Sequence, residues 1–143
     1  METLQKLTRR QLETLHAVLE SEDADHGASL NRIAGRLGVR PPSALSHLTP
    51  LETLGLVARH RGKSRITERG RRTLVEYQRH HRVAETLFGR LGLSPDATCA
   101  AAREVDLSMS HETVEQICAA EGHPSVCPHG EPIIGCSSRK EGA

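Results

Sequence analysis

Five residues in the second half of this sequence have the types and spacing to bind a divalent metal ion together. His81 and Glu85 are four positions apart, so in a helix their side chains project from one face. Cys127 and His129 are two positions apart in a proline-containing loop, which would point both side chains the same way if extended. A loop folding back onto that helix would gather imidazole, carboxylate and thiolate groups around one ion, with Cys99 as a further ligand.

The cysteines indicate free thiols or metal ligands rather than disulfides. The N-terminal residues lack the apolar stretch of a secretory signal, so we expect a cytoplasmic protein in a reducing compartment. No CxxC pair occurs, which argues against a zinc ribbon or a thioredoxin-type site. Thiolate ligands favour Fe(II), Zn(II) or an iron–sulfur cluster over Mn(II), although the wide cysteine spacing is unlike that of ferredoxins.

Several of these residues also have purely structural interpretations. The alternatives are solvated charge for His81, an ion pair with Arg82 or Arg90 for Glu85, core packing for Cys118 and loop packing for His123. Cys136, near the polar tail, is expected to be unstructured or only weakly involved.

Two other kinds of chemistry compete with metal binding. A thiol redox switch would use Cys99, Cys118 or Cys127, and it requires a lowered thiol pKa. A hydrolase would pair Cys127 with His129 or His81, but no oxyanion-donor loop or glycine-rich elbow accompanies them. We therefore expect a protein that is not an enzyme.

The candidate ligands lie on a predicted series of helices. Thr67 caps a long helix over 68–92, which suits a connecting and dimerising role through the apolar residues Leu74, Val83, Leu87 and Phe88. Shorter helices are predicted over 94–106 and 110–122, each beginning at a serine cap. The remaining residues are expected to form a loop and a tail.

The first part of the chain predicts a helix-turn-helix. Thr8 caps a first helix, which is expected to end at the polar, flexible segment 21–28. Ser29 begins a second helix that stops at Gly38, and prolines at 41 and 42 open a third. This spacing is typical of a motif whose last helix enters the major groove of DNA.

A β-hairpin wing is predicted next, with strands on either side of a turn at 61–63. Basic side chains on the wing would contact phosphates, and polar side chains of the third helix would approach base edges. The expected DNA-binding residues are Arg40, Ser43, Ser46 and His47 on the helix and Arg59, Arg61, Lys63 and Arg65 on the wing. Pro50 conflicts with the third helix, which must either kink near Ser46 or end early and restart at Leu51.

Composition favours a DNA-binding dimer. Residues 1–82 contain fifteen Lys and Arg and nine Asp and Glu, whereas residues 83–143 contain four and nine. A basic half therefore precedes an acidic half. Tyr77 and Phe88 are the only aromatic residues, which leaves each half a thin core that dimerisation would complete. No apolar run of 18 residues is present, so no membrane partner is expected.

Three passages resemble the diphtheria-toxin-repressor family of iron- and manganese-dependent repressors (DtxR/MntR). They are RPPSALSHL…LETLGLV…ITERG, HHRVAETLF and GHPSVCPHGEPI, and with their spacing they cover nearly the whole chain. The resemblance implies a mainly α chain with a small β-hairpin wing, in which a winged helix-turn-helix (1–72) precedes a helical dimerisation and metal-binding domain (73–143). It looks like the two-domain form of the family, which lacks an SH3-like domain.

The resemblance also assigns ligands. Residues matching His81, Glu85, Cys127 and His129 are metal ligands in various members, and Cys99 falls where some have a histidine. At the family's regulatory site, Asp106 keeps a carboxylate and Glu104 is a possible substitute ligand. Leu107 replaces a histidine, however, and arginines at 10 and 103 stand where ligands would be, although arginine does not bind metal.

We thus expect a homodimeric repressor whose binding to a double-stranded DNA operator responds to a divalent ion. Fe2+ is favoured, with Zn2+ or Mn2+ possible, and an iron–sulfur cluster or a thiol redox switch is the alternative sensor.

Overall fold

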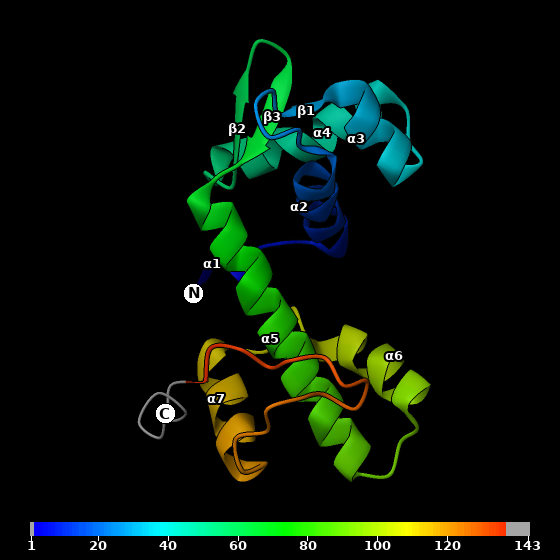
Figure 1. Ribbon diagram of the computed structural model, residues 1–143, viewed down its shortest axis with the longest axis vertical. Helices are drawn as coiled ribbons and strands as arrows, with labels where there is room; N and C mark the ends of the chain where they lie inside the picture. The colour runs from blue at the N-terminus through cyan, green and yellow to red at the C-terminus, as the bar shows by residue number, and fades with distance from the viewer. Residues whose placement is uncertain (1, 137–143) are drawn as a thin grey trace. The chain divides into compact units, whose positions relative to one another are not determined.

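The computed structural model describes residues 2–136 and consists of two units. The winged-helix unit is Lys6–Leu74, and the C-terminal unit combines the described parts of Met1–Gln5 and Val75–Ala143. Helices dominate both, and a small sheet occurs in the first (Figure 1). This architecture confirms the predicted fold class.

Three helices form the body of the winged-helix unit. Helix α2 (Arg9–Ser21) begins at Thr8, whose side chain accepts the Gln11 N–H while the Gln11 side chain accepts that of Thr8. Helix α3 (Leu30–Leu37) ends at a left-handed glycine at 38, and α4 (Pro41–Thr53) follows. All three helices pack against one another around a core of buried aliphatic side chains that includes Leu12, Leu15, Ile33, Leu48 and Leu51.

The wing is part of a three-stranded antiparallel sheet rather than an isolated hairpin. Strand β3 (Lys63–Ile66) lies between β1 (Ala28–Ser29) and β2 (Val57–His60). The turn between β2 and β3 consists of Arg61 and Gly62, which both have positive φ angles of 50° and 75°. Lys63, which was expected in the turn, is therefore the first residue of a strand.

The segment 21–28 ends the first helix at Ser21, as predicted, but it is not the free loop that was expected. Asp23 and Gly27 form a β-bridge, and the Glu22 side chain accepts the backbone N–H of Ile66. Gly27 has a φ of 69°, and a Cβ added there would lie 2.9 Å from the Ser64 carbonyl oxygen. The segment is held by partners about forty residues away, which local sequence patterns do not reveal.

Pro50 neither ends α4 nor forces a restart, because the helix runs unbroken from Pro41 to Thr53. Its missing N–H removes only the bond to the carbonyl of Ser46, an exposed residue that water reaches. The helix then closes normally, since the Leu54 N–H donates to the Pro50 carbonyl at 3.0 Å.

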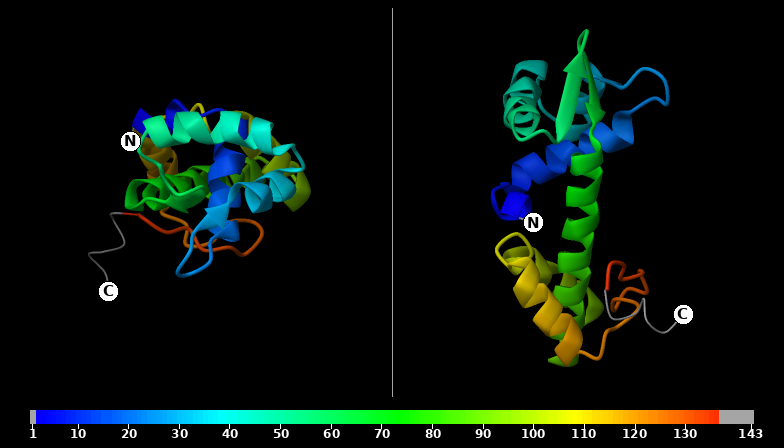
Figure 2. Two further views of the ribbon diagram at one scale, coloured as in Figure 1. Left: turned by 90° about the horizontal axis from the view of Figure 1, so that it is seen from above. Right: turned by 90° about the vertical axis from the view of Figure 1, so that its left-hand side faces the viewer.

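The C-terminal unit is built around the long helix α5 (Glu68–Arg90), which begins in the winged-helix unit. Helices α6 (Pro95–Val105) and α7 (His111–Ala120) start at serine caps as predicted, and a short α1 (Glu2–Gln5) was not predicted. The segment after α7 returns across one face of α5 (Figures 1 and 2). This return brings the 123–136 loop onto the helix that carries His81 and Glu85.

A compact apolar cluster holds the loop in place. Its buried members come from α5, α7 and the loop, and they are Val83, Val114, Cys118, Cys127, Ile133 and Cys136. In the part of the chain that the structure describes, no helix is long and apolar enough to cross a membrane.

Candidate functional site

The carboxylate of Glu85 is the centre of the candidate metal site. Glu85 is only 4% exposed and lies one helical turn after His81 on α5. Its Oε1 is 2.8 Å from Nε2 of His81, and its Oε2 is 2.5 Å from Nδ1 of His129. One buried carboxylate thus joins a helix imidazole to a loop imidazole.

One thiol lies on each side of Glu85, Cys99 with His81 and Cys127 with His129. Sγ of Cys99, on α6, lies 3.6 Å from Nε2 of His81. The donor atoms form two overlapping triplets, His81–Glu85–Cys99 and Glu85–Cys127–His129, each with all atoms within 4.8 Å of one another. The structure therefore places the five candidate ligands in two neighbouring triplets that share Glu85, and we call this set of five residues the Glu85 centre.

Asp106 acts on the orientation of His81. It is fully buried, and its Oδ2 is 2.9 Å from Nδ1 of His81. With an ion bound at Nε2, this carboxylate would accept the Nδ1 proton and hold the ring so that Nε2 faces the ion beside Glu85 and Cys99. Glu104, the other possible extra ligand, is exposed on α6 and belongs to none of the metal-binding groups among the described residues.

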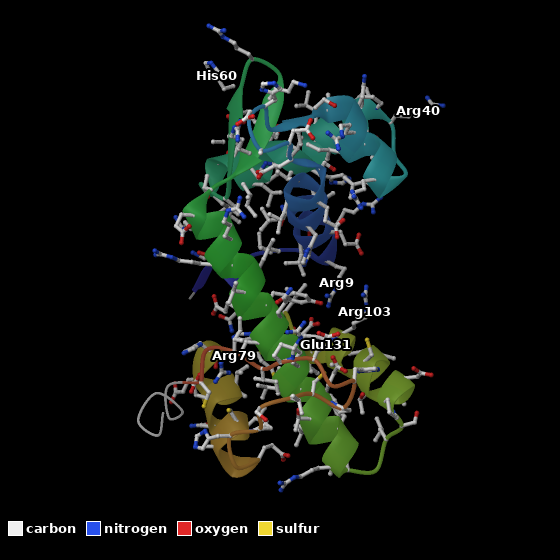
Figure 3. The ribbon with its side chains drawn as sticks, viewed as in Figure 1. Arg9, Arg40, His60, Arg79, Arg103 and Glu131 are labelled. Carbon is white, nitrogen blue, oxygen red and sulfur yellow. The ribbon has the colours of Figure 1, made fainter. Side chains whose placement is uncertain are left out.

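Local contacts fix the loop that carries Cys127 and His129. The Cys127 N–H donates to the Glu131 carbonyl at 2.9 Å, which closes a tight turn around His129. Nη1 of Arg82 donates to the Pro132 carbonyl at 2.6 Å and ties the loop to α5. Both Arg82 and Glu131 are thus engaged near the helix (Figure 3 labels Glu131).

A glycine on α5 gives the loop room to approach. A Cβ added at Gly89 would lie 3.1 Å from Cγ of Pro128. The loop therefore packs directly on the backbone of α5, one turn after Glu85, which keeps Cys127 and His129 within reach of the carboxylate.

The donor set fits a divalent cation. A carboxylate removed from water needs a positive partner, and the two imidazoles beside Glu85 in the described chain supply one only when they are protonated. Imidazole, carboxylate and thiolate are together the ligands of Fe(II) and Zn(II) sites. His81, Glu85, Cys99, Cys127 and His129 would hold the ion, and Asp106 would support His81.

Two further groups of metal-binding residue types were missed by the sequence analysis. One consists of Cys118, His123 and Cys136, and the other of Glu76, His80 and His111. Cys136 is 5% exposed inside the apolar cluster, so the expectation that it is unstructured or only weakly involved is wrong. The spacing of Glu76 and His80, four apart on a helix, was the available signal for the second group.

Burial raises the pKa of the Cys118 thiol, and its hydrogen bond with Cys136 acts in the same direction. A redox switch needs a thiolate at neutral pH, so a metal-free Cys118 is poorly suited to that role.

The exposed face of α4 carries the helix residues expected to contact DNA. Arg40 is exposed at the N-cap, and Figure 3 shows it projecting from the turn between α3 and α4. Ser43 and Ser46 are exposed, whereas His47 is half-buried. The Ser46 hydroxyl donates to the Pro42 carbonyl at 3.1 Å, which leaves its lone pairs free to accept a bond.

The wing divides its basic residues between two faces. Lys63 pairs with His60 and Arg65 with Ala58, so these four share the exposed face. Arg59 pairs with Ser64 on the opposite face, and its Nη1 is 3.8 Å from Glu52 of α4. The structure therefore separates Arg59 from the other three wing residues.

A groove of about 490 Å³ runs along that exposed face. Its lining combines the turn and strands with the preceding loop and includes Asp25, His26, His60, Arg61, Lys63 and Arg65. The sequence analysis missed His60, whose signal was its alternation with Ala58 on a strand (Figure 3).

Comparison with known proteins matches both units. The family model of the iron dependent repressor, metal binding and dimerisation domain covers residues 67–135, and the model of the LexA DNA binding domain covers residues 4–66. The chain belongs to the diphtheria-toxin-repressor-like family of metal-dependent DNA-binding transcriptional repressors. Membership of this family confirms the resemblance found in the sequence and the expectation that the chain is not an enzyme.

Solved structures agree with this membership. The chain is similar to the hypothetical protein SSo2273 from Sulfolobus solfataricus, with 31% identity, a TM-score of 0.85 and coverage of 90% of this chain and 100% of that one. It also resembles T. acidophilum IdeR, with 26% identity, a TM-score of 0.61 and coverage of 91% of this chain and 61% of that one. A manganese-dependent transcriptional repressor in complex with manganese has 30% identity, a TM-score of 0.66 and coverage of 88% of this chain and 58% of that one. The chain thus spans about three-fifths of the length of these last two. The comparison with curated proteins gives no match.

Three residues that differ from the ligands of the family's regulatory site take no part in a metal-binding group of the described residues. Leu107 is half-buried, Arg103 is exposed on α6 (Figure 3), and Arg10 forms an ion pair with Glu13 at 3.2 Å. Leucine and arginine side chains offer no lone pair to a cation. The metal-binding groups of the described residues lie elsewhere.

Proposed function

We propose that this protein is a repressor whose operator binding responds to a divalent ion held at the Glu85 centre. The observation that supports this most directly is the Glu85 carboxylate, which faces His81 on one side and His129 on the other. A bound ion supplies positive charge that links α5 and α6 to the loop. Ligands from three segments stabilise one conformation, and that preference shifts the population of DNA-competent molecules.

Residues of the winged-helix unit would contact the bases and phosphates of the operator. We assign 1–72 to DNA binding, with Ser43, Ser46 and His47 at base edges and Arg40, Arg61, Lys63 and Arg65 at phosphates. Arg59 would act differently, because its contact with Glu52 positions the wing against α4.

Residues 73–143 would form the dimer and hold the metal. Large apolar side chains that stay exposed lie in the C-terminal unit, among the described residues, and they are Val75, Leu91, Leu93, Val126 and Ile134. Exposed apolar side chains of this kind favour burial against a second copy. A DNA-binding dimer of this kind would act in the cytoplasm.

We propose Fe(II) as the ion that is bound in the cell. Two thiols beside one carboxylate and two imidazoles make a softer site than Mn(II) prefers, and Zn(II) is the main competitor. An iron–sulfur cluster finds less support, since no metal-binding group of the described residues contains more than two cysteines.

A DNA-binding titration of the purified protein tests the proposal. We expect Fe(II), added anaerobically, to tighten operator binding and a chelator to reverse the effect. Glu85→Gln should abolish the response because it removes the shared carboxylate, whereas Glu112→Gln, at an exposed position on α7, should keep it. Operator binding that responds to peroxide but ignores the chelator would instead support a thiol switch.

A further inference from the structure

A second set of soft ligands lies away from the Glu85 centre, between the end of α7 and the end of the described loop. The sulfur atoms of Cys118 and Cys136 are 3.8 Å apart. Nδ1 of His123 lies 3.8 Å from the first sulfur and 3.2 Å from the second. Both cysteines are buried, and His123 is half-buried. The three donors face one another without any carboxylate among them.

These separations match those of a tetrahedral zinc ion. Zn–S bonds of about 2.3 Å and Zn–N bonds of about 2.0 Å at tetrahedral angles place two sulfurs about 3.8 Å apart and a sulfur about 3.5 Å from a nitrogen. The observed S–S distance agrees, and the two S–N distances lie on either side of the ideal value.

The backbone adopts uncommon conformations to bring these donors together. His123 has a φ of 55°, which non-glycine residues rarely adopt, and its N–H donates to the Cys118 carbonyl at 2.8 Å. This bond folds the chain back over the last turn of α7. Gly135 has a φ of 83°, and a Cβ there would lie 3.2 Å from Cδ of Arg79, so a glycine lets Cys136 approach. Strain of this kind persists where surrounding structure fixes it, often at ligand sites.

We propose that Cys118, His123 and Cys136 form a second metal site for a soft divalent ion of the Zn2+ type, separate from the Glu85 centre. The three side chains supply three ligands, and water completes the tetrahedron. His123 and Cys136 stand at the two ends of the loop that carries Cys127 and His129. An ion there closes the base of that loop against α7 and stabilises the C-terminal unit.

Cobalt binding to a thiol-depleted protein tests this site directly. In the full chain with Cys99→Ser and Cys127→Ser, the only thiols left are Cys118 and Cys136. Anaerobic Co2+ titration should give one tetrahedral ion with thiolate charge-transfer absorption, and Zn2+ should displace it. One equivalent of Zn2+ should protect both thiols from a thiol reagent and raise the melting temperature.

His123→Ala in the same protein should weaken Zn2+ binding more than about tenfold, whereas His26→Ala, at an exposed position in the other unit, should not change it. Circular dichroism of the metal-free variants checks that they fold. Tetrahedral cobalt absorption that survives His123→Ala unchanged, or thiols that remain reactive with Zn2+ present, would overturn the proposal. The two proposals fail separately. If operator binding by the unmodified chain does not respond to iron while the thiol-depleted chain still binds cobalt, the proposed function is rejected and this second site is not.

Discussion

At the scale of single residues, Asp106 shows how a buried carboxylate can serve a metal site without binding the ion. Its Oδ2 lies 2.9 Å from Nδ1 of His81, and with an ion bound at Nε2 it would accept the Nδ1 proton and hold the ring plane. We predict that Asp106→Asn lowers metal affinity at the Glu85 centre by about ten- to a hundredfold. Competition with a fluorescent chelator measures this, and Asp96→Asn, at an exposed position on α6, is the matched control. Equal affinities of the two variants would mean that Asp106 has only a packing role.

His80 makes the metal-free protein sensitive to acid. Burial lowers the pKa of His80 to about 4, and the charges of His111 and Arg79 act in the same direction. The unfolded chain takes up this proton near its ordinary pKa of 6.5, before the native state does, so stability falls as the pH drops from about 6.5 to about 4. The loss attributable to His80 reaches about 3 kcal/mol at the acid end.

Urea unfolding in chelator across this pH range checks the prediction. His80→Gln should flatten the curve, and His26→Gln should leave it unchanged because His26 is exposed. Parallel curves for His80→Gln and the unaltered chain would contradict the prediction.

Residue types and spacing were enough to predict the composition of the Glu85 centre, but not each side chain's role. His81 and Glu85 share a helix face in any α-helix, so their proximity follows from periodicity alone. The separation of ligand from orienting residue depends on which ring nitrogen faces which carboxylate. That direction is set by the contacts of His81 with Asp106 and Cys99, which lie 18 or more positions away and which no local pattern encodes.

At the scale of elements, the start of α5 depends on a glycine. A Cβ added at Gly70 would lie 2.3 Å from the Leu56 carbonyl oxygen and 2.7 Å from Cγ1 of Ile66. Because backbone must move to make room, we predict that Gly70→Ala destabilises the winged-helix unit by about 2 kcal/mol. Gly35→Ala on α3 meets nothing within 4 Å and should instead add about 0.5–1 kcal/mol of stability. Denaturant unfolding of both variants measures the contrast, and a neutral Gly70→Ala would refute it.

Elements stabilised by their own sequence were predicted, and those that depend on distant partners were not. Thr8, Ser29, Ser94 and Ser110 each cap a helix through a side-chain oxygen that accepts a nearby N–H. Strand β1 has only two residues, and its pairing lies with β3 more than thirty positions later. Its existence therefore could not be derived from local alternation.

At the scale of the whole molecule, the exposed apolar side chains of the C-terminal unit should determine self-association. Leu91 is 68% exposed, the most of these side chains. We predict that Leu91→Glu raises the dimer dissociation constant more than about tenfold, because a charge would have to be buried at the contact. Sedimentation velocity measures this, with Ala120→Glu on the exposed side of α7 as control. Unchanged association in Leu91→Glu would place the dimer contact elsewhere.

The charge asymmetry of the chain leads to a prediction about salt. Lys63 and Arg65 lie on the exposed face of β3, beside the groove of the wing, whereas Arg90 belongs to the acidic C-terminal unit. A side chain that neutralises one phosphate releases about one counterion, so Lys63→Ala and Arg65→Ala should each reduce the slope of log K against log salt by about 1. Arg90→Ala should leave the slope unchanged.

Ser43→Ala should also leave the salt slope unchanged, but it should alter the preference between operator sequences. The reason is that base contacts carry the sequence information and phosphate contacts do not. Equal slopes for all four variants would show that DNA binds another face of the winged-helix unit.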